Sequence, residues 1–253
     1  MPWNPDQYHK FSAERSAPFD DLLQLVQVRT GLRVVDLGCG TGELTRKLAD
    51  ALPDSDVVGI DTSDQMLEKA AKHARPGLRF EQGDQSDLSG EWDLIFSNAA
   101  LQWSEDHAHL FPKLIGRLKP GGQLAVQMPS NHEHISHRVI RSAAGREPFR
   151  SALKGWVRFA PVLSIEIYAD LLFQQNVERI QVFEKVYPHV LADADAVVEW
   201  ISGTALVPYF ERLVEPVREQ FTQAIRAELR AAMPGSPLFY PFKRTFLSGF
   251  KHD

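Results

Sequence analysis

Short apolar runs alternate with helix-like segments over the first 130 residues. Each run has four to six residues rich in Val, Ile, Leu or Phe, which is typical of buried strands. Between the runs, leucines recur every four residues, as at Leu44, Leu48 and Leu52, which is the spacing of a helix that buries one face. The strands predicted in this way are residues 33–37, 57–60, 78–81, 93–97 and 123–128.

Local signals predict where several of these helices begin and end. Thr62 and Gln65 have the spacing of a capping box at the start of the helix after the second strand. Leucines four residues apart between 110 and 118 predict a further helix, which the stretch KPGG at 119–122 closes. Strands that alternate with helices indicate βαβ units, and hence a parallel sheet covered on both faces.

The second half of the chain is more helical. We expect helices at 165–175 and 194–202, a strand at 177–186, and a long helix between 210 and 229 that is broken near Pro216. Residues 239–250 predict one long strand or a strand pair. The helices between 190 and 233 could cover the ligand edge of the sheet as an insert.

The expected organisation is therefore a single doubly wound α/β domain with a helical insert or cap. Its predicted parts are N-terminal lid helices in 1–30, a cofactor-binding core in 31–130, helical insert or cap regions in 131–176 and 190–235, and C-terminal strands in 177–189 and 238–252.

Composition narrows the class of protein. The 253 residues carry a formal net charge of −5 without a cluster of Lys and Arg, which argues against a nucleic-acid partner. No run approaches the length of a membrane span, and the N-terminus lacks the apolar core of a signal peptide. The single cysteine, Cys39, fits a reducing compartment, so a cytoplasmic location is expected. The histidines at 132, 134 and 137 lack the H-E-x-x-H pattern, and we expect a polar loop there without a metal.

The stretch DLGCGTG, residues 36–42, follows the first predicted strand and is the strongest chemical signal. Glycine removes the Cβ that would keep a ligand from the backbone. The order is G-x-G-x-G, and Glu43 stands where the dinucleotide fingerprint has its third glycine. A carboxylate there would repel a pyrophosphate, and no G-K-[ST] is present. A nicotinamide oxidoreductase is therefore disfavoured, and a ligand without phosphates is favoured.

Acidic residues end the neighbouring strands. Asp36 can face an ammonium or sulfonium group by charge complementarity. Asp61, about 20 residues past the glycines, stands where a carboxylate accepts both ribose hydroxyls. Asp84 could accept from an adenine amine, and Met66 could pack on the adenine ring. A nucleoside joined to an amino acid, without phosphate, describes S-adenosylmethionine.

Several stretches then resemble the class I S-adenosylmethionine-dependent methyltransferases: VVDLGCGTG, GIDTS, GDQSD, DLIFSNAALQW and LKPGGQLAV. Others extend the resemblance over nearly the whole chain, to the trans-aconitate methyltransferase family: WNPDQYHKFSAERSAP, SNAALQW, DHAHLFPKL, LAVQMPSN and VVEWISGTALVPYF. The resemblance implies a Rossmann-like, mostly parallel sheet of seven strands whose last strand is antiparallel. It implies a cofactor site of Asp36, Gly38, Gly40, Asp61, Thr62, Met66, Asp84, Gln85, Asn98 and Ala99.

The methyl acceptor is expected to be a small carboxylic acid. The segment 97–100, SNAA, lacks the N/D-P-P-Y/F motif of enzymes that methylate DNA bases or glutamine side chains. A carboxylate is ionised at neutral pH, so positioning without a general base would suffice. The positioning candidates are Arg15, Gln102 and Trp103; the substrate-binding candidates are Trp3, Tyr8, Phe11, Arg15, Trp103 and Arg146, with the N-terminal aromatic residues as lid material.

One position departs from the resembled family, which carries GLRP where this chain has Ala205 to Pro208 with Val207 in place of the arginine. Lys243 and Arg244 could compensate or could face solvent. Alternative acceptors are the free carboxylate of a malonyl thioester and a hydroxyl on a specialised metabolite. A protein that binds S-adenosylmethionine without catalysis also stays open. The oligomeric state is left undecided, and a monomer is compatible with the sequence.

Overall fold

The computed structural model describes residues 12–252, with side chains from Ala17 onward. The predicted lid residues Trp3, Tyr8 and Phe11 lie outside the described residues, and of Arg15 only the backbone, in helix α2 (Ser12–Gln24), is described. The chain divides into two compact units. The sheet unit comprises 16–129, 161–185 and 244–253, and the helical unit includes 130–160 and 186–243.

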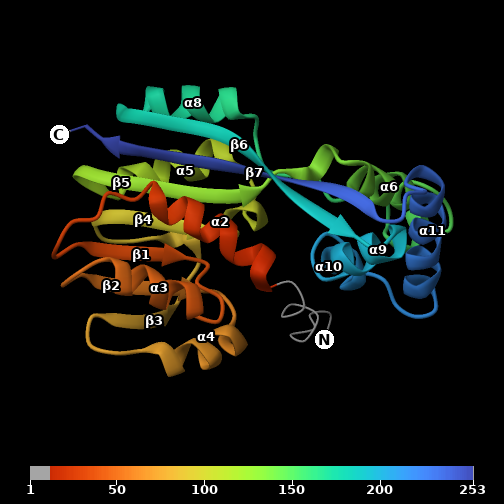
Figure 1. Cartoon of the computed structure of the whole chain (residues 1–253), viewed down its shortest axis with the longest axis horizontal. Coiled ribbons are helices and arrows are strands. Elements are labelled where there is room, and N and C mark those ends of the chain that lie inside the picture. Colours follow the sequence, from red (N-terminus) through yellow and green to blue (C-terminus); the bar gives the residue numbers. More distant parts are fainter. Residues whose placement is uncertain (1–11, 253) are drawn as a thin grey trace. The chain divides into compact units, whose positions relative to one another are not determined.

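Seven strands form one sheet in the order β3-β2-β1-β4-β5-β7-β6 (Figure 1). The neighbouring pairs among β1 to β5 are parallel, and β7 runs antiparallel to β5. This confirms the predicted doubly wound sheet and its antiparallel last strand. The strands are β1 (Arg33–Leu37), β2 (Asp56–Asp61), β3 (Leu78–Gln82), β4 (Trp92–Asn98), β5 (Leu118–Pro129), β6 (Val177–Leu191) and β7 (Leu238–Lys251).

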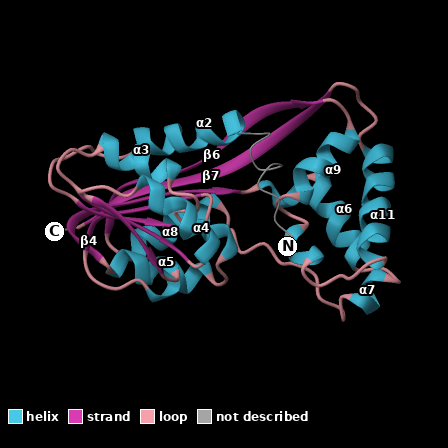
Figure 2. Ribbon diagram, turned by 90° about the horizontal axis from the view of Figure 1, so that it is seen from below, coloured by secondary structure: helices cyan, strands magenta, loops and turns pink. Residues whose placement is uncertain are grey.

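Helices cover both faces of the sheet unit (Figure 2). On one face, α5 (His107–Gly116) and α8 (Ile165–Gln174) bury Phe111 and Leu172 in an apolar core with alternate residues of β1, β4 and β5. On the other face lie α2 and α3 (Glu43–Ala51), where Phe19 packs edge-on against Phe96 of β4. Because side chains alternate along a strand, each central strand contributes to both layers.

Three local predictions need correction. Helix α5 ends at Gly116, and Leu118 opens β5 by pairing with Trp92, so KPGG lies inside the strand rather than closing the helix. Helix α4 (Asp64–Ala70) is capped by Ser63, whose hydroxyl accepts from the Met66 N–H, and not by a Thr62 capping box. A serine directly before the helix satisfies the same N–H group, so the longer-range pair is not needed.

The third correction concerns the histidine-rich segment, which was expected to be a polar loop. It forms a 3-10 turn, η4 (Asn131–Glu133), followed by α6 (Ile135–Ala144). The His134 ring caps this helix by accepting from the Ser136 N–H, which fixes its start. Within residues 12–252, no group of three His, Cys, Asp or Glu side chains could hold a metal ion.

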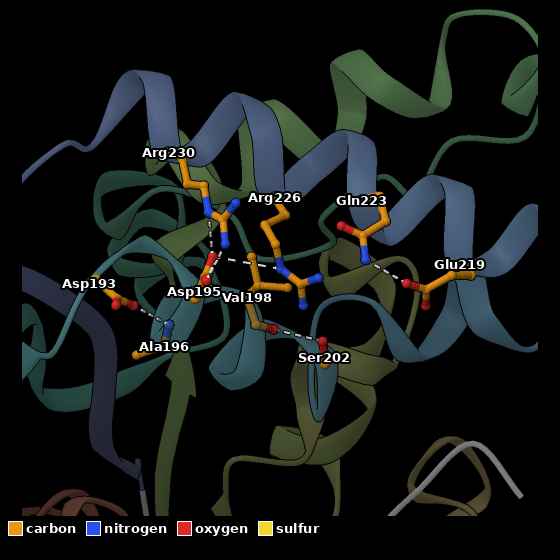
Figure 3. A network of polar contacts seen from close by, with 9 residues as sticks. All are labelled: Asp193, Asp195, Ala196, Val198, Ser202, Glu219, Gln223, Arg226 and Arg230. Carbon is orange, nitrogen blue, oxygen red and sulfur yellow. Dashed lines mark hydrogen bonds and ion pairs between the residues drawn. The ribbon is translucent and has the colours of Figure 1, made fainter.

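The helical unit is built around α11 (Val217–Ala232), which packs on α6 and on α9 (Ala194–Ser202). Pro216 stands directly before α11, which confirms the predicted break. Arg230 donates to Asp195 from Nε at 2.8 Å, and Arg226 lies beside the same carboxylate (Figure 3). The remaining short elements within residues 12–252 are α7 (Phe149–Ala152), α10 (Val207–Phe210), η1 (Ala71–His73), η2 (Gln85–Asp87) and η3 (Leu101–Trp103).

None of the helices described here is both long and apolar enough to cross a bilayer.

Candidate functional site

The glycine loop is anchored by the strand beside it. The backbone N–H groups of Gly38 and Cys39 both donate to the Ile60 carbonyl oxygen of β2, at 2.8 and 3.0 Å. The Gly42 N–H closes the turn on the Cys39 carbonyl at 3.1 Å. These bonds place the loop at the carboxyl ends of β1 and β2, the edge at which doubly wound sheets bind ligands.

The three loop glycines are needed for different reasons, although all have positive φ. A Cβ on Gly38 would lie 2.2 Å from the Ala100 Cβ, so this position must be bare for packing. A Cβ on Gly42 would lie 2.8 Å from both Ala70 and Phe80. A Cβ on Gly40 would meet no atom of the described residues within 4 Å. The open space at Gly40 therefore leaves the backbone approachable by a ligand.

Asp61 links the glycine loop to the start of α4. Its Oδ2 accepts from the Gly40 N–H at 2.9 Å, and its Oδ1 accepts from the Ser63 N–H at 2.9 Å. Each carboxylate oxygen has a second lone pair, so Asp61 can hold the loop and still accept from two hydroxyl groups. This is the arrangement expected for a ribose.

Asp36 lies beneath the loop and is the most perturbed acid of the site. It is 3% exposed, and its Oδ2 accepts from Thr45 Oγ1 at 2.6 Å. Its Oδ1 has no hydrogen-bond partner in the described part of the chain. Burial raises the pKa of Asp36 to about 7; the Thr45 hydrogen bond opposes this, and the charge of Asp61 adds to it.

Such a carboxylate fits a positively charged ligand. An ammonium or sulfonium group beside Asp36 would give its second oxygen a partner and would favour the ionised form. Asp36, once ionised, and Asp61 together place negative charge at this edge, which disfavours a pyrophosphate. The residues present therefore fit S-adenosylmethionine by charge and by the open approach at Gly40.

The segment after β3 is tied to the segment after β4. Asp84 turns the chain into η2 by accepting from the Ser86 N–H at 2.7 Å. Gln85 Nε2 donates to Ser104 Oγ at 2.6 Å, which links the two strand ends. Met66, on α4, is half-buried, and Thr62 is exposed. Thr62 and Met66 follow β2, and Asp84 and Gln85 follow β3, so all four lie past the carboxyl ends of two neighbouring parallel strands.

The segment after β4 has a constrained backbone. Ala99 has φ +55, which is uncommon for a residue with a side chain. Its N–H donates to the Gln127 carbonyl at 2.9 Å, and its own carbonyl accepts from Gln102 Nε2 at 2.7 Å. Asn98 Oδ1 accepts from Gln127 Nε2 at 2.8 Å. Backbone strain held by several hydrogen bonds is typical of functional sites.

A buried histidine, which sequence reasoning missed, fixes the far end of this segment. His107 Nδ1 lies 2.5 Å from the Tyr168 hydroxyl, and its Nε2 lies 2.8 Å from the Leu101 carbonyl. The Leu101 carbonyl can only accept, so Nε2 carries the proton, and Nδ1 accepts from the Tyr168 hydroxyl, which itself accepts from the Leu163 N–H. Burial lowers the pKa of His107, in keeping with a neutral ring. The pair joins α5 and α8, which lie far apart in sequence, and no short motif marks it.

The acceptor-side candidates are distributed over both units. Trp103 ends η3 and is 49% exposed, so it is not a core residue. Gln102 points back to the Ala99 carbonyl. Arg146 is on the surface of the helical unit, paired with Glu228 of α11, and Val207 opens α10 in that unit. Burial raises the pKa of the Cys39 thiol far above its usual range, so Cys39 is unsuited to act as a nucleophile.

Comparison with known proteins agrees with this geometry. Residues 29–153 match the family model described as Methyltransferase domain. The chain is 48% identical to a trans-aconitate 2-methyltransferase of Deinococcus radiodurans over 96% of both chains, and 40% identical to one of Azoarcus sp. over 97% of both. The crystal structure of the YcgJ protein from Bacillus subtilis superposes with a TM-score of 0.62 at 16% identity, covering 94% of this chain and 99% of that one. This structural likeness shows the fold.

Proposed function

We infer the reaction from one premise: the chain belongs to the trans-aconitate 2-methyltransferase family and uses S-adenosylmethionine. We propose that it transfers the methyl group to a carboxylate oxygen of a small polycarboxylic acid such as trans-aconitate. The observation that carries this proposal is the 48% identity over 96% of both chains to a relative of that name. The site geometry supports it independently on the cofactor side.

The proposed cofactor contacts follow the strand ends. Asp36 would face the positive charge of the methionine part, and the open backbone at Gly40 would lie against it. Asp61 would accept from the ribose hydroxyls while it keeps its bonds to Gly40 and Ser63. Met66 and Asp84 would take the adenine, and Asn98 and Ala99 would border the sulfur. When bound, S-adenosylmethionine supplies a methyl group on a positively charged sulfur.

No side chain has to remove a proton in the proposed reaction. A carboxylic acid has a reference pKa of about 4, so its oxygen already carries the electron pair that forms the new bond. The protein then contributes alignment and exclusion of water. The hydrogen bonds that hold Ala99 and the His107 contact that holds Leu101 give the segment after β4 the rigidity that alignment requires.

The finer choice of acid is the part of the proposal that depends on Val207. An arginine there, as in the resembled family, would bind a carboxylate through charge-assisted hydrogen bonds worth about 1.5–3 kcal/mol. Half-buried Val207 cannot supply them. We therefore propose a carboxylate acceptor, and treat trans-aconitate as the leading member of a class of small di- and tricarboxylates. A cytoplasmic location is proposed on the single cysteine alone.

Turnover against a panel of acceptors tests this proposal. The panel should contain trans-aconitate, shorter di- and tricarboxylates, a malonyl thioester and simple alcohols, with S-adenosylhomocysteine as the measured product. Turnover is expected to be confined to acids with a free carboxylate and to be highest for the small polyacids. Turnover of the alcohols alone would refute the carboxylate assignment. Binding of S-adenosylhomocysteine without turnover of any compound would favour a non-catalytic protein.

A further inference from the structure

Three polar side chains lie side by side on one face of the sheet, the face that also carries Asp36. Asn98 at the end of β4 is in register with Gln127 of β5. Gln127 is in register with Phe246 of β7, so Arg244, two residues away, is its diagonal neighbour on the same face. Gln127 is 0% exposed and Arg244 is 6% exposed. We call Arg244, Gln127 and Asn98 the amide relay.

Hydrogen bonds run through the amide relay in one direction. Arg244 Nη1 donates to Gln127 Oε1 at 3.1 Å, and Gln127 Nε2 donates to Asn98 Oδ1 at 2.8 Å. A guanidinium group can only donate, so Gln127 must turn its oxygen toward Arg244 and its nitrogen toward Asn98. Asn98 must in turn use its oxygen here. The buried Arg244 therefore leaves the Nδ2 group of Asn98, which is a donor, on the side of the amide that faces away from Gln127.

The relay also acts on the backbone of the segment after β4. The carbonyl oxygen of Gln127 accepts from the N–H of Ala99, the residue with φ +55. Gln127 therefore fixes the side chain of Asn98 and the backbone of the next residue. The charge of Arg244 sets the direction of these hydrogen bonds. Arg244 is buried, which corrects the alternative that it faces solvent. The neighbouring Lys243 is exposed.

The second amide hydrogen-bonding group of Asn98 is available to a ligand. Asn98 is half-buried, and along residues 17–252 its Nδ2 has no hydrogen-bond partner. The Nδ2 group of Asn98 can donate a hydrogen bond to an anionic oxygen, whereas a cation offers it no acceptor. A carboxylate, which accepts hydrogen bonds only, is the functional group that matches it.

We propose that Arg244 is a positioning residue for the methyl acceptor, which acts through Gln127 to present the Asn98 N–H group to a carboxylate of that acceptor. This inference rests on the proposed function, because it names the group that the acceptor must carry. In this proposal, Arg244 contributes indirectly to binding the acceptor carboxylate, whereas Val207, in place of the family's arginine, does not contribute to it. The acceptor class it predicts includes any acid with a free carboxylate and excludes neutral alcohols.

Gln127→Glu is the sharpest test, since it nearly preserves shape and reverses the polarity. A glutamate at 127 accepts from Arg244 and from Asn98 alike, so Asn98 turns its oxygen toward the acceptor. The KM of the acceptor is expected to rise about ten- to hundredfold, as for a lost charge-assisted hydrogen bond, with the Kd of S-adenosylhomocysteine within about twofold. Because the new carboxylate pairs with Arg244, the melting temperature should not fall. A purely structural relay predicts no change in KM.

Substitutions at Arg244 and Asn98 provide a second, independent arm. Arg244→Met should raise KM as Gln127→Glu does, and Arg244→Lys should recover part of the loss because an ammonium group also only donates. Asn98→Ala combined with Arg244→Met should lose no more acceptor affinity than Asn98→Ala alone, since one acts through the other. Lys243→Met, which removes the adjacent exposed charge, is the matched control and should leave KM unchanged.

The outcomes separate this inference from the proposed function. If the wild-type protein methylates a small carboxylic acid and Gln127→Glu keeps its acceptor KM, the relay inference alone is wrong. If Arg244→Met and Asn98→Ala lower acceptor affinity additively, Arg244 does not act through Asn98. If the wild-type protein binds S-adenosylhomocysteine but methylates no carboxylate, the proposed function fails and the relay inference fails with it.

Discussion

Thr45 of α3 donates a hydrogen bond of 2.6 Å to one oxygen of Asp36, and the other oxygen of that buried carboxylate has no partner among the described residues. One hydrogen bond does not offset the burial, which is why the pKa of Asp36 rises to about 7. The free protein thus holds a carboxylate that is ready to gain a cationic ligand.

Cofactor binding should depend on pH through Asp36. A cation requires the ionised carboxylate, so affinity should fall about tenfold for each pH unit below the pKa near 7. The Kd of S-adenosylhomocysteine, measured by calorimetry between pH 5.5 and 7.5, should therefore weaken toward acid, with release of one proton on binding. Asp36→Asn should bind more weakly at every pH and show a flat profile. A wild-type Kd that does not change over this range would contradict this account of Asp36.

The same shift predicts how the stability of the free protein varies with pH. The folded state holds the Asp36 proton up to about pH 7, whereas the unfolded chain releases it near 3.8. The contribution of Asp36 to stability is therefore fully present below about pH 4 and is lost as the pH rises through about 7. Asp36→Asn should remove this loss, so the difference in melting temperature between variant and wild type should widen from pH 5 to pH 8.

The same substitution should affect two glycines of one loop differently: Gly38→Ala should mainly lower stability, and Gly40→Ala should mainly weaken cofactor binding. Gly38→Ala places a Cβ 2.2 Å from the Ala100 Cβ at φ +73 and should destabilise the fold by about 2–5 kcal/mol. Gly40→Ala places a Cβ that meets no atom of residues 17–252 and should cost only about 1–2 kcal/mol for its positive φ, yet weaken cofactor binding at least about tenfold. Thermal unfolding and calorimetry on both variants measure this. Unweakened binding in Gly40→Ala would show that the ligand does not approach there.

Asp61→Ala should weaken S-adenosylhomocysteine binding about a hundredfold or more. The substitution removes the acceptor for two backbone N–H groups, those of Gly40 and Ser63, together with the proposed ribose contact. Asp64→Ala, an exposed acid in the first turn of α4, is the matched control and should bind normally. Equal affinity in the two variants would remove Asp61 from the site.

His107 should act on the acceptor step and leave cofactor affinity unchanged. His107→Phe removes the contact to the Leu101 carbonyl and should lower kcat while the Kd of S-adenosylhomocysteine stays within about twofold. Because the pKa of His107 is lowered on folding, its contribution to stability is present above about pH 6.5 and lost as the pH falls below that value. Tyr168→Phe, which removes the hydroxyl that donates to Nδ1, should show the same partial loss of kcat.

The pattern of apolar residues predicted the parallel part of the sheet, because strand-length apolar runs are local properties of the chain. The number of strands and the antiparallel last strand were implied by the family resemblance. Residues 33–37 were predicted to the residue, and the loop glycines, Asp61, Asp84 and Asn98 stand at or just past the ends of four parallel strands, as predicted. Helix boundaries were less accurate. Ser63 displaced Thr62 as the cap because both can supply a hydroxyl, and only the folded backbone decides which one reaches the Met66 N–H.

The residues that sequence reasoning missed depend on contacts between distant segments. Tyr168 meets His107 across 61 positions, and Arg244 meets Gln127 across 117. No spacing rule connects such pairs, since they arise only when α8 and β7 return to the sheet. A buried arginine and a buried histidine are also indistinguishable in sequence from exposed ones. Burial and hydrogen-bond direction, which come from the structure, assign them their roles.

The central claim is that the chain methylates a carboxylate, and the chemistry of the product tests it most directly. The purified protein should be incubated with S-adenosylmethionine and trans-aconitate, and the product analysed by mass spectrometry before and after mild alkaline hydrolysis. We predict a product heavier by one CH₂, formed in equal amount with S-adenosylhomocysteine, that returns to trans-aconitate and methanol in alkali. A methylated product that survives alkali, or no methylated acid while S-adenosylhomocysteine binds normally, would contradict the claim.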